Sequence, residues 1–168
     1  MGDCMLYLKI VDVKKFMSKL LIQNVFDNFL LSEFDVVTFA AFHINGKNNK
    51  SWYDTDEPEG SEEYVKWGQI KPYAYQAVKG SKTPTSMKVV CYLSKENRER
   101  LISRVGGNWK TEDVSQFCLN MKYENGEMIL TAGIAYNIFT MEHTLLEQWE
   151  SDLKKYLKYY EIEYEVIA

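Results

Sequence analysis

The chain has 168 residues, of which 46% are hydrophobic and 26% charged, and its formal net charge is −4 at pH 7. A globular chain of this length buries roughly 70% of its unfolded surface, so we expect a single domain over residues 1–168, or two small halves that share a core. The negative charge excludes attraction of the whole chain to nucleic acid or an anionic membrane, which would need a local basic face.

The first elements predicted are a strand, a helix and two or three strands. Residues 5–11 form a short apolar run with β-branched and aromatic members, which predicts a strand. Asp12 is a predicted N-cap, because apolar side chains then recur at helical spacing from Val13 to Leu21. Strands are then predicted at 28–34 and 36–44, with Asp35 between them, and a short third strand at 51–53.

The middle of the chain is predicted to be a surface loop followed by a helix. Residues 54–63 are polar and acidic, and they begin like a calcium-binding loop. The sixth and twelfth positions are Glu59 and Val65 where that loop needs Gly and Glu, so a solvated loop is favoured. Residues 64–79 are predicted to be mostly helical, with Pro72 limiting where an unbroken helix can run.

The second half repeats this order. A strand is predicted at 87–93, and Ser94 is predicted to cap a helix that stops at Gly106-Gly107. Asn125-Gly126 is typical of a type I′ hairpin turn, because both residues must adopt positive φ. Strands are predicted on either side of this turn at 116–123 and 127–132, and another at 135–141. The last helix is predicted at roughly 144–160, with one stripe of Trp149, Leu153, Tyr156, Leu157 and Tyr160. The closing strand is predicted at 161–167.

These elements predict an α+β fold with a mostly antiparallel sheet. Strand, helix and then two or three strands occur in both halves, which suggests an internal pseudo-repeat of residues 5–86 and 87–168. A sheet built in this way has free edges, which we expect at the first strand, 5–11, and at the closing strand, 161–167. Unpaired edges favour pairing with another chain, so a homodimer or higher oligomer is predicted.

The segment from Lys88 to Met141 carries a resemblance to a known fold. KVVCYLSKENRERLISRV followed by DVSQFCLNMKYENGEMILTAGIAYNIFTM resembles the strand–helix–hairpin–strand unit of DNA sliding clamps, including an Ala-Gly turn before the final strand. The chain is far shorter than a bacterial clamp, so a closed ring would need several copies. As a whole, the sequence is similar to a family of uncharacterised proteins from Firmicutes, and that similarity implies no assigned activity.

The predicted function is a non-enzymatic binding or assembly protein with a clamp-like fold. All but five of the 20 Lys and Arg residues lie in or beside predicted helices, as a surface for sequence-independent contact with DNA phosphates requires. Solvated helix faces give the same pattern, because Lys and Arg are good helix formers. The residues expected to make weak DNA contacts are Lys14, Lys15, Lys19, Arg98, Arg100, Arg104, Lys154, Lys155 and Lys158.

The alternative is a small α+β enzyme or a domain that binds a small molecule in an aromatic-lined pocket. The chain has 12 Tyr and 4 Trp residues, and such side chains are favoured in pockets. No nucleotide-binding or nucleophile motif is present, so no catalytic residue and no cofactor is predicted. His43 and His143 have no neighbouring Cys or His at ligand spacing, so no metal site is predicted.

The cysteines and the lack of long apolar runs indicate in which cellular compartment the protein is expected. Cys4, Cys91 and Cys118 are odd in number, and the last two lie in apolar runs where a reduced thiol behaves as a small core residue. This favours a reducing compartment. No apolar run approaches the roughly 18 residues of a membrane span, and we therefore expect a cytoplasmic protein without a membrane partner.

Overall fold

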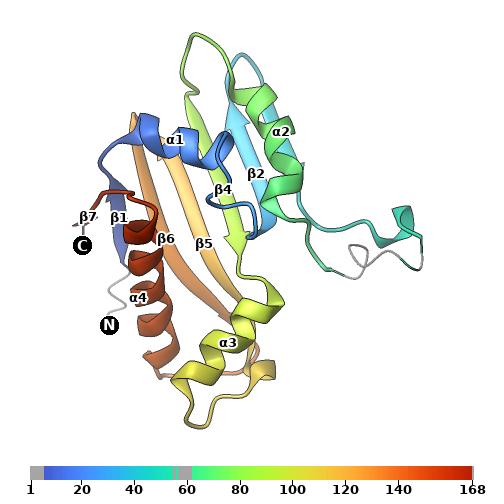
Figure 1. Ribbon diagram of the computed structural model, residues 1–168, viewed down its shortest axis with the longest axis vertical. Coiled ribbons are helices and arrows are strands. Elements are labelled where there is room, and N and C mark those ends of the chain that lie inside the picture. The colour runs from blue at the N-terminus through green and yellow to red at the C-terminus, as the bar shows by residue number, and fades with distance from the viewer. Residues whose placement is uncertain (1–5, 55, 57–61, 168) are drawn as a thin grey trace.

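Seven strands form one antiparallel sheet in the order β3-β2-β4-β5-β6-β1-β7 (Figure 1). The computed structural model describes residues 6–54, 56 and 62–167. The strands are β1 Tyr7–Ile10, β2 Leu30–Val37, β3 Ala41–Asn45, β4 Ser86–Tyr92, β5 Val114–Glu124, β6 Glu127–Tyr136 and β7 Tyr164–Ile167. The helices are α1 Val13–Leu21, α2 Trp67–Val78, α3 Lys95–Val105 and α4 Thr144–Tyr159, with short 3-10 helices at Lys50–Trp52 and Thr111–Asp113. The predicted α+β class is confirmed.

The long hairpin of β5 and β6 forms the centre of the sheet. Its turn is Asn125-Gly126, with φ values of 55° and 79°, as the sequence predicts. The two strands pair from Glu124 opposite Glu127 to Val114 opposite Tyr136. This register fixes which side chains of both strands point toward the helices, because successive residues of a strand alternate between its two faces.

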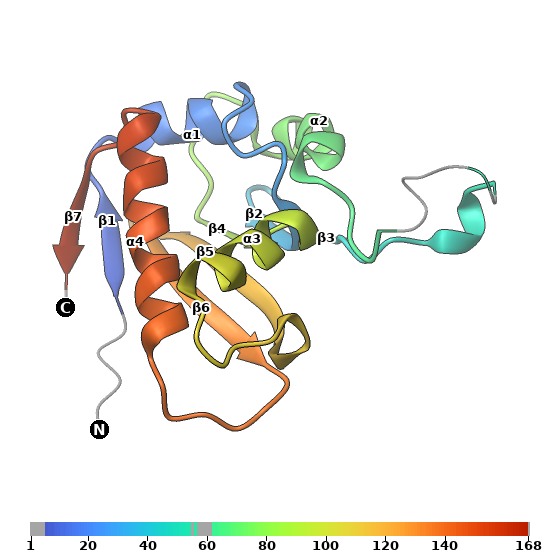
Figure 2. The ribbon, with the colours of Figure 1, turned by 60° about the horizontal axis from the view of Figure 1, so that its bottom comes forward.

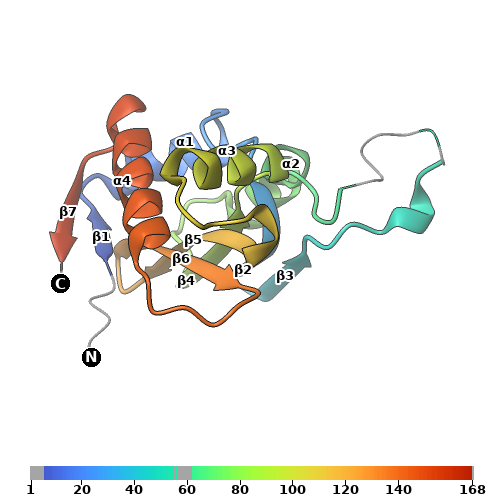
Figure 3. The same cartoon turned by 90° about the horizontal axis from the view of Figure 1, so that it is seen from below.

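All four helices lie on one face of the sheet (Figures 2 and 3). The strand side chains that point toward them are buried, among them Val89, Leu119, Met121 and Leu130, and they join one hydrophobic core with residues of the helices. Each large apolar side chain that is fully buried contributes roughly 1.5–3 kcal/mol. The other face of the sheet carries no helix among the described residues, and it exposes or half-buries its side chains.

Two predicted helix starts are confirmed by their capping hydrogen bonds. The Asp12 side chain accepts from the Lys15 backbone N–H at 3.0 Å, and the Ser94 hydroxyl accepts from the Asn97 N–H at 3.2 Å. Each bond satisfies a backbone donor that has no partner within the helix. Helix α2 continues through Pro72, so this proline does not break the helix. None of the described helices combines the length and the apolar character needed to cross a membrane.

Two cysteines lie in the central strands and are free thiols. Cys91 is fully buried and Cys118 is half-buried. Burial raises the pKa of Cys91 to about 12 and that of Cys118 to about 11, so both thiols stay protonated at neutral pH. The expectation that Cys91 is a small core residue is confirmed, whereas Cys4 falls outside the described residues.

Three predicted strand boundaries are wrong. Asp35 lies inside β2, and the turn to β3 falls at 38–40 instead, because Asp35 points to the uncovered face where a carboxylate remains hydrated. Residues 51–53 are not a strand, since Lys50–Trp52 is a 3-10 helix. The predicted strand at 135–141 and the turn before it do not form, because β6 runs unbroken through Gly133 to Tyr136.

The strand pairing does not confirm the pseudo-repeat or the clamp-like arrangement. Strand β4 pairs with β2 and β5, whereas its expected counterpart β1 pairs with β6 and β7. The expectation that residues 5–11 form a sheet edge is also wrong, because β1 lies between β6 and β7. The two edge strands of the sheet are β3 and β7, and β7 lies within the predicted closing strand. Self-association through these edges stays a prediction.

Trp67 provides a test of the core, because its side chain is 0% exposed and its Nε1 donates to the Leu20 carbonyl at 2.8 Å. Replacing it by Phe leaves a cavity and removes that hydrogen bond. We expect Trp67→Phe to lower the free energy of unfolding by about 2–4 kcal/mol in urea denaturation. Trp52→Phe is the matched control, because Trp52 is 77% exposed, and it should change stability by less than about 0.5 kcal/mol. Equal losses in both variants would contradict this account.

Candidate ligand-binding cleft

A cleft of about 390 Å³ opens on the helix-covered face between α3, α4 and the segment that leads into β2. Helices α3 and α4 lie next to each other there (Figures 1 and 2). We refer to it as the α3–α4 cleft. Its lining residues are Asn28, Phe29, Leu93, Ser94, Asn97, Arg100, Leu101, Arg104, Trp149, Asp152, Leu153, Tyr156 and Tyr160.

One wall of the cleft is aromatic and held in place by packing and hydrogen bonds. The rings of Phe29 and Tyr156 meet edge to face, with centroids 5.5 Å apart, and Tyr160 packs on Tyr156 at 4.8 Å. Trp149 donates from Nε1 to the Cys118 carbonyl at 2.8 Å, and the Tyr156 hydroxyl donates to the Val25 carbonyl. These bonds tie α4 to the sheet and to the segment after α1, so the aromatic wall is preorganised.

Burial of Tyr156 also sets its protonation state. Desolvation raises the pKa of its phenol well above the ordinary value, so the hydroxyl remains a neutral donor at physiological pH. The Val25 carbonyl therefore keeps its partner over the whole physiological range.

The cleft also has a polar part, which carries two arginines of α3. Arg104 donates from Nη2 to Asp152 Oδ2 at 2.5 Å and from Nη1 to Oδ1 at 3.4 Å. The hydrogen bond that Arg104 donates to Asp152 is the main cause that raises the pKa of Arg104. Gln148 donates to Asp152 Oδ1 at 2.8 Å, which helps to hold this carboxylate. Arg104 is therefore engaged within the protein.

Arg100 is paired more weakly than Arg104. It donates to Glu96 Oε1 at 2.6 Å, but both side chains are mostly exposed, at 68% and 73%. Exposed ion pairs of this kind contribute about 0.3–0.5 kcal/mol, so Arg100 can leave Glu96 at little cost. With Arg100, Arg104 and Asp152 counted together, the charged residues that line the cleft have an excess of one positive charge.

The N-terminal end of α3 also borders the cleft. Ser94 and Asn97 both line it, and the amides of the first helical turn carry the positive end of the helix dipole. The Ser94 hydroxyl is occupied by its capping bond. Besides the two arginines, the polar side chains among the described lining residues are Asn28, Ser94, Asn97, Asp152, Tyr156 and Tyr160.

The nine predicted DNA-contact residues lie on three helices, α1, α3 and α4, and their role in DNA contact stays a prediction. Only Arg100 and Arg104 line the cleft. Arg98 faces the other side of α3, where it donates to Gln116 Oε1 at 3.2 Å. The other six are on α1 (Lys14, Lys15 and Lys19) and on α4 (Lys154, Lys155 and Lys158).

The lysines of α1 lie close to acidic residues. Lys15 and Lys19 border a small cleft together with Glu161 and Glu163, which follow α4. Lys19 is only 9% exposed, so it offers little surface to a DNA phosphate. Glu161 and Glu163 therefore reduce the positive electrostatic potential around the lysines of α1.

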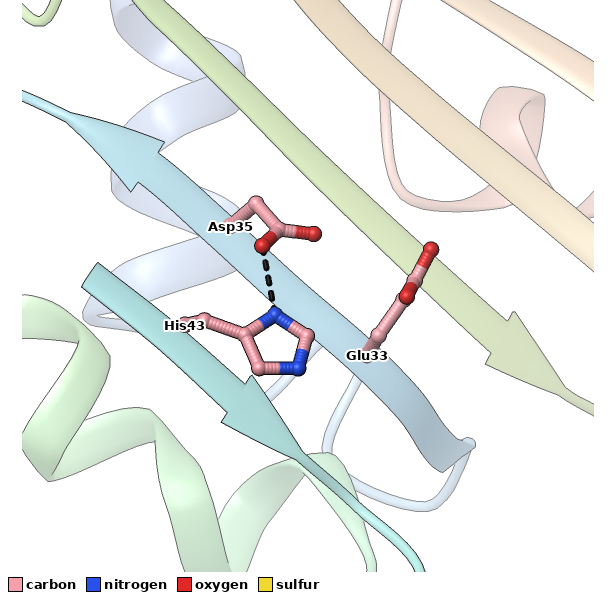
Figure 4. Close-up of side chains that lie close together, drawn as sticks. All are labelled: Glu33, Asp35 and His43. Atoms are coloured by element: carbon pink, nitrogen blue, oxygen red, sulfur yellow. Dashed lines mark hydrogen bonds and ion pairs between the residues drawn. The ribbon is translucent and has the colours of Figure 1, made fainter. Parts of the chain in front are cut away.

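A second polar cluster lies on the uncovered face of the sheet and was not predicted from the sequence (Figure 4). It consists of Glu33 and Asp35 of β2 and His43 of β3. His43 is on the edge strand β3, whereas His143 immediately precedes α4. The predicted acidic loop at 54–63 lies largely outside the described residues, which include only Asp54, Asp56 and 62–63 of it.

The ion pair of Arg104 and Asp152 tests how the polar part of the cleft is held. We expect Asp152→Asn to lower the free energy of unfolding by about 0.5–1 kcal/mol, because the ion pair with Arg104 is lost. The loss stays small because the exposed Arg104 is rehydrated. The loss should shrink at high salt, which screens the pair in the parent protein. Arg100→Ala is the control and should cost less, since its pair is more exposed. A salt-independent loss in urea denaturation would argue that Asp152 acts through packing instead.

A comparison with models of protein families matches residues 19–165 to DUF5721, a family of unknown function. The match includes every residue that lines the α3–α4 cleft. Comparisons with the curated proteins and with the solved structures found no match. The expected relation to a family without assigned activity is thus confirmed, whereas a clamp-like second half and an origin in Firmicutes gain no support.

Proposed function

The chain belongs to DUF5721, a family of unknown function, and we propose that it is a non-enzymatic protein that binds a small molecule in the α3–α4 cleft. The ligand proposed has a flat ring and an anionic group. The observation that carries this proposal is the pairing of an aromatic wall with an excess of positive charge in one cleft.

The size and lining of the cleft support a small-molecule ligand. Its volume of about 390 Å³ falls within the range of roughly 300–1,000 Å³ that is usual for ligand pockets. Such pockets combine mostly apolar and aromatic lining with a few polar groups that orient the ligand. Phe29, Tyr156 and Tyr160 provide the ring contacts here.

The charges of the cleft support an anionic group on that ligand. Arg100 is the more exposed of the two arginines, and its planar guanidinium can form two parallel hydrogen bonds with a carboxylate or a phosphate. The end of α3 adds a favourable dipole on the same side. A cationic ligand would meet Arg100 and Arg104, whose carboxylate partners Glu96 and Asp152 are already engaged in ion pairs.

The proposal is tested by a thermal-shift panel of matched ligands. Aromatic carboxylates and nucleoside monophosphates are compared with the corresponding amides and nucleosides. A ligand at about 100 times its Kd stabilises the folded state by about 2.7 kcal/mol, which raises Tm by several degrees. We expect this rise for charged members of the panel and a much smaller one for their neutral counterparts.

Two variants connect any such response to the cleft. Arg100→Ala should abolish most of the shift, whereas Lys155→Ala removes the same charge from α4 outside the cleft and should keep it. The proposal fails if no member stabilises the protein. The proposal of an anionic group is contradicted if the neutral ligands stabilise the protein as much as the charged ones. It is also contradicted if Arg100→Ala and Lys155→Ala show the same shift.

Weak contact with duplex DNA is the second candidate. The observation in its favour is that Lys14, Lys155 and Lys158 form no ion pair among the described residues and are exposed. Exposed lysines can exchange counterions with phosphates without regard to sequence.

Fluorescence anisotropy with a short labelled duplex across a salt series addresses this candidate. If it is right, affinity falls steeply with salt, and the Lys155→Ala, Lys158→Ala double variant reduces the slope of log K against log salt by nearly two. Lack of binding even at low salt would remove the candidate without affecting the cleft.

A further inference from the structure

Three possible metal ligands come together on the uncovered face of the sheet (Figure 4). His43 of β3 lies directly opposite Asp35 of β2 in the antiparallel register. Glu33 lies two residues before Asp35, so its side chain points to the same face, opposite to the buried Phe34. The two strands thus present one imidazole and two carboxylates to solvent at one place.

The distances between these groups suit a common ion. His43 Nδ1 is 2.5 Å from Asp35 Oδ1, and one ligand atom of each of the three residues lies within 4.8 Å of the others. A zinc-class ion binds nitrogen and oxygen ligands at about 2.0–2.2 Å, which places neighbouring ligand atoms roughly 3–4 Å apart. Small rotations of exposed side chains are enough to reach that geometry.

We propose that Glu33, Asp35 and His43 form a site for a divalent transition-metal ion of the Zn²⁺ class. The imidazole nitrogen is the reason to favour this class over Ca²⁺ or Mg²⁺, which prefer oxygen ligands. The site is open to solvent, because the His43 side chain is 57% exposed, so water completes the coordination. An ion there would join β2 to the edge strand β3.

A lysine already forms an ion pair with one of the two carboxylates. Lys88 of β4 lies next to the cluster, with Nζ 2.9 Å from Glu33 Oε1, and it is opposite Asp35 in the register. The hydrogen bond to Glu33, followed by the charges of Glu33 and Asp35, raises the pKa of Lys88. A dication must displace this ammonium from Glu33, so Lys88 acts as an internal competitor of the metal.

The competition between Lys88 and a metal ion distinguishes two hypotheses, a metal site and a network of ion pairs without a metal. If the carboxylates serve only Lys88, removing Lys88 gives no new binding. If they form a metal site, removing Lys88 frees Glu33 and strengthens binding. The site does not depend on the ligand of the α3–α4 cleft, because the cleft is on the other face of the sheet.

The experiment is calorimetric titration of the full chain, after chelation and dialysis, with Zn²⁺ alone. We expect one equivalent to bind, and His43→Ala to weaken binding at least about tenfold, since even loss of an outer-shell partner costs that much. His143→Ala is the matched control, because His143 is also exposed but lies at the start of α4. It should leave the affinity unchanged.

Two further measurements make the result decisive. Lys88→Ala should strengthen Zn²⁺ binding several-fold, whereas Lys122→Ala, which removes an exposed lysine from the next strand, should change it less. Co²⁺ in place of Zn²⁺ should give ligand-field bands without a thiolate-to-cobalt band, which excludes the cysteines as ligands. The proposal is overturned if Zn²⁺ does not bind, if His43→Ala binds as the parent does, or if the thiolate band appears.

Discussion

Burial of only one face of the sheet is the constraint on which the rest of the structure depends. All four helices lie on that face, so the apolar side chains of the central strands must point toward it. The uncovered face is then left for polar side chains such as Asp35 and Lys88, whose charges stay hydrated. The α3–α4 cleft forms where two of the helices meet, and Glu33, Asp35 and His43 come together on the face that no described helix covers.

Local signals were enough to predict the elements whose conformation depends on neighbouring residues. The Asn125-Gly126 turn requires positive φ, and the caps at Asp12 and Ser94 bind amides three residues away, so a short window of sequence contains the whole cause. The Asp35 boundary failed for the opposite reason. A charged residue inside a strand looks like a break until the cross-strand partners on its face are known.

The cleft could be predicted only in part. Helical spacing predicts the stripe of Trp149, Leu153 and Tyr156 on α4, and these side chains pack in or against the core while they also line the cleft. Asn28 and Phe29 come from a segment more than 60 residues before α3, and nothing near them in the sequence indicates that they meet Arg100. The same holds for His43 and Glu33, which become neighbours through strand register and not through a ligand motif.

The place of β1 between β6 and β7 has a consequence for synthesis on the ribosome. Its hydrogen-bonding partners are residues 129–131 and 164–167, so β1 emerges from the ribosome long before either strand that pairs with it. The β2–β3 and β5–β6 hairpins can close as they emerge, whereas β1 must wait for most of the chain. Contacts between residues so far apart in sequence slow folding, because a long loop must close before they form. In the nascent chain, β1 therefore stays unpaired until residues 129–131 and 164–167 have emerged.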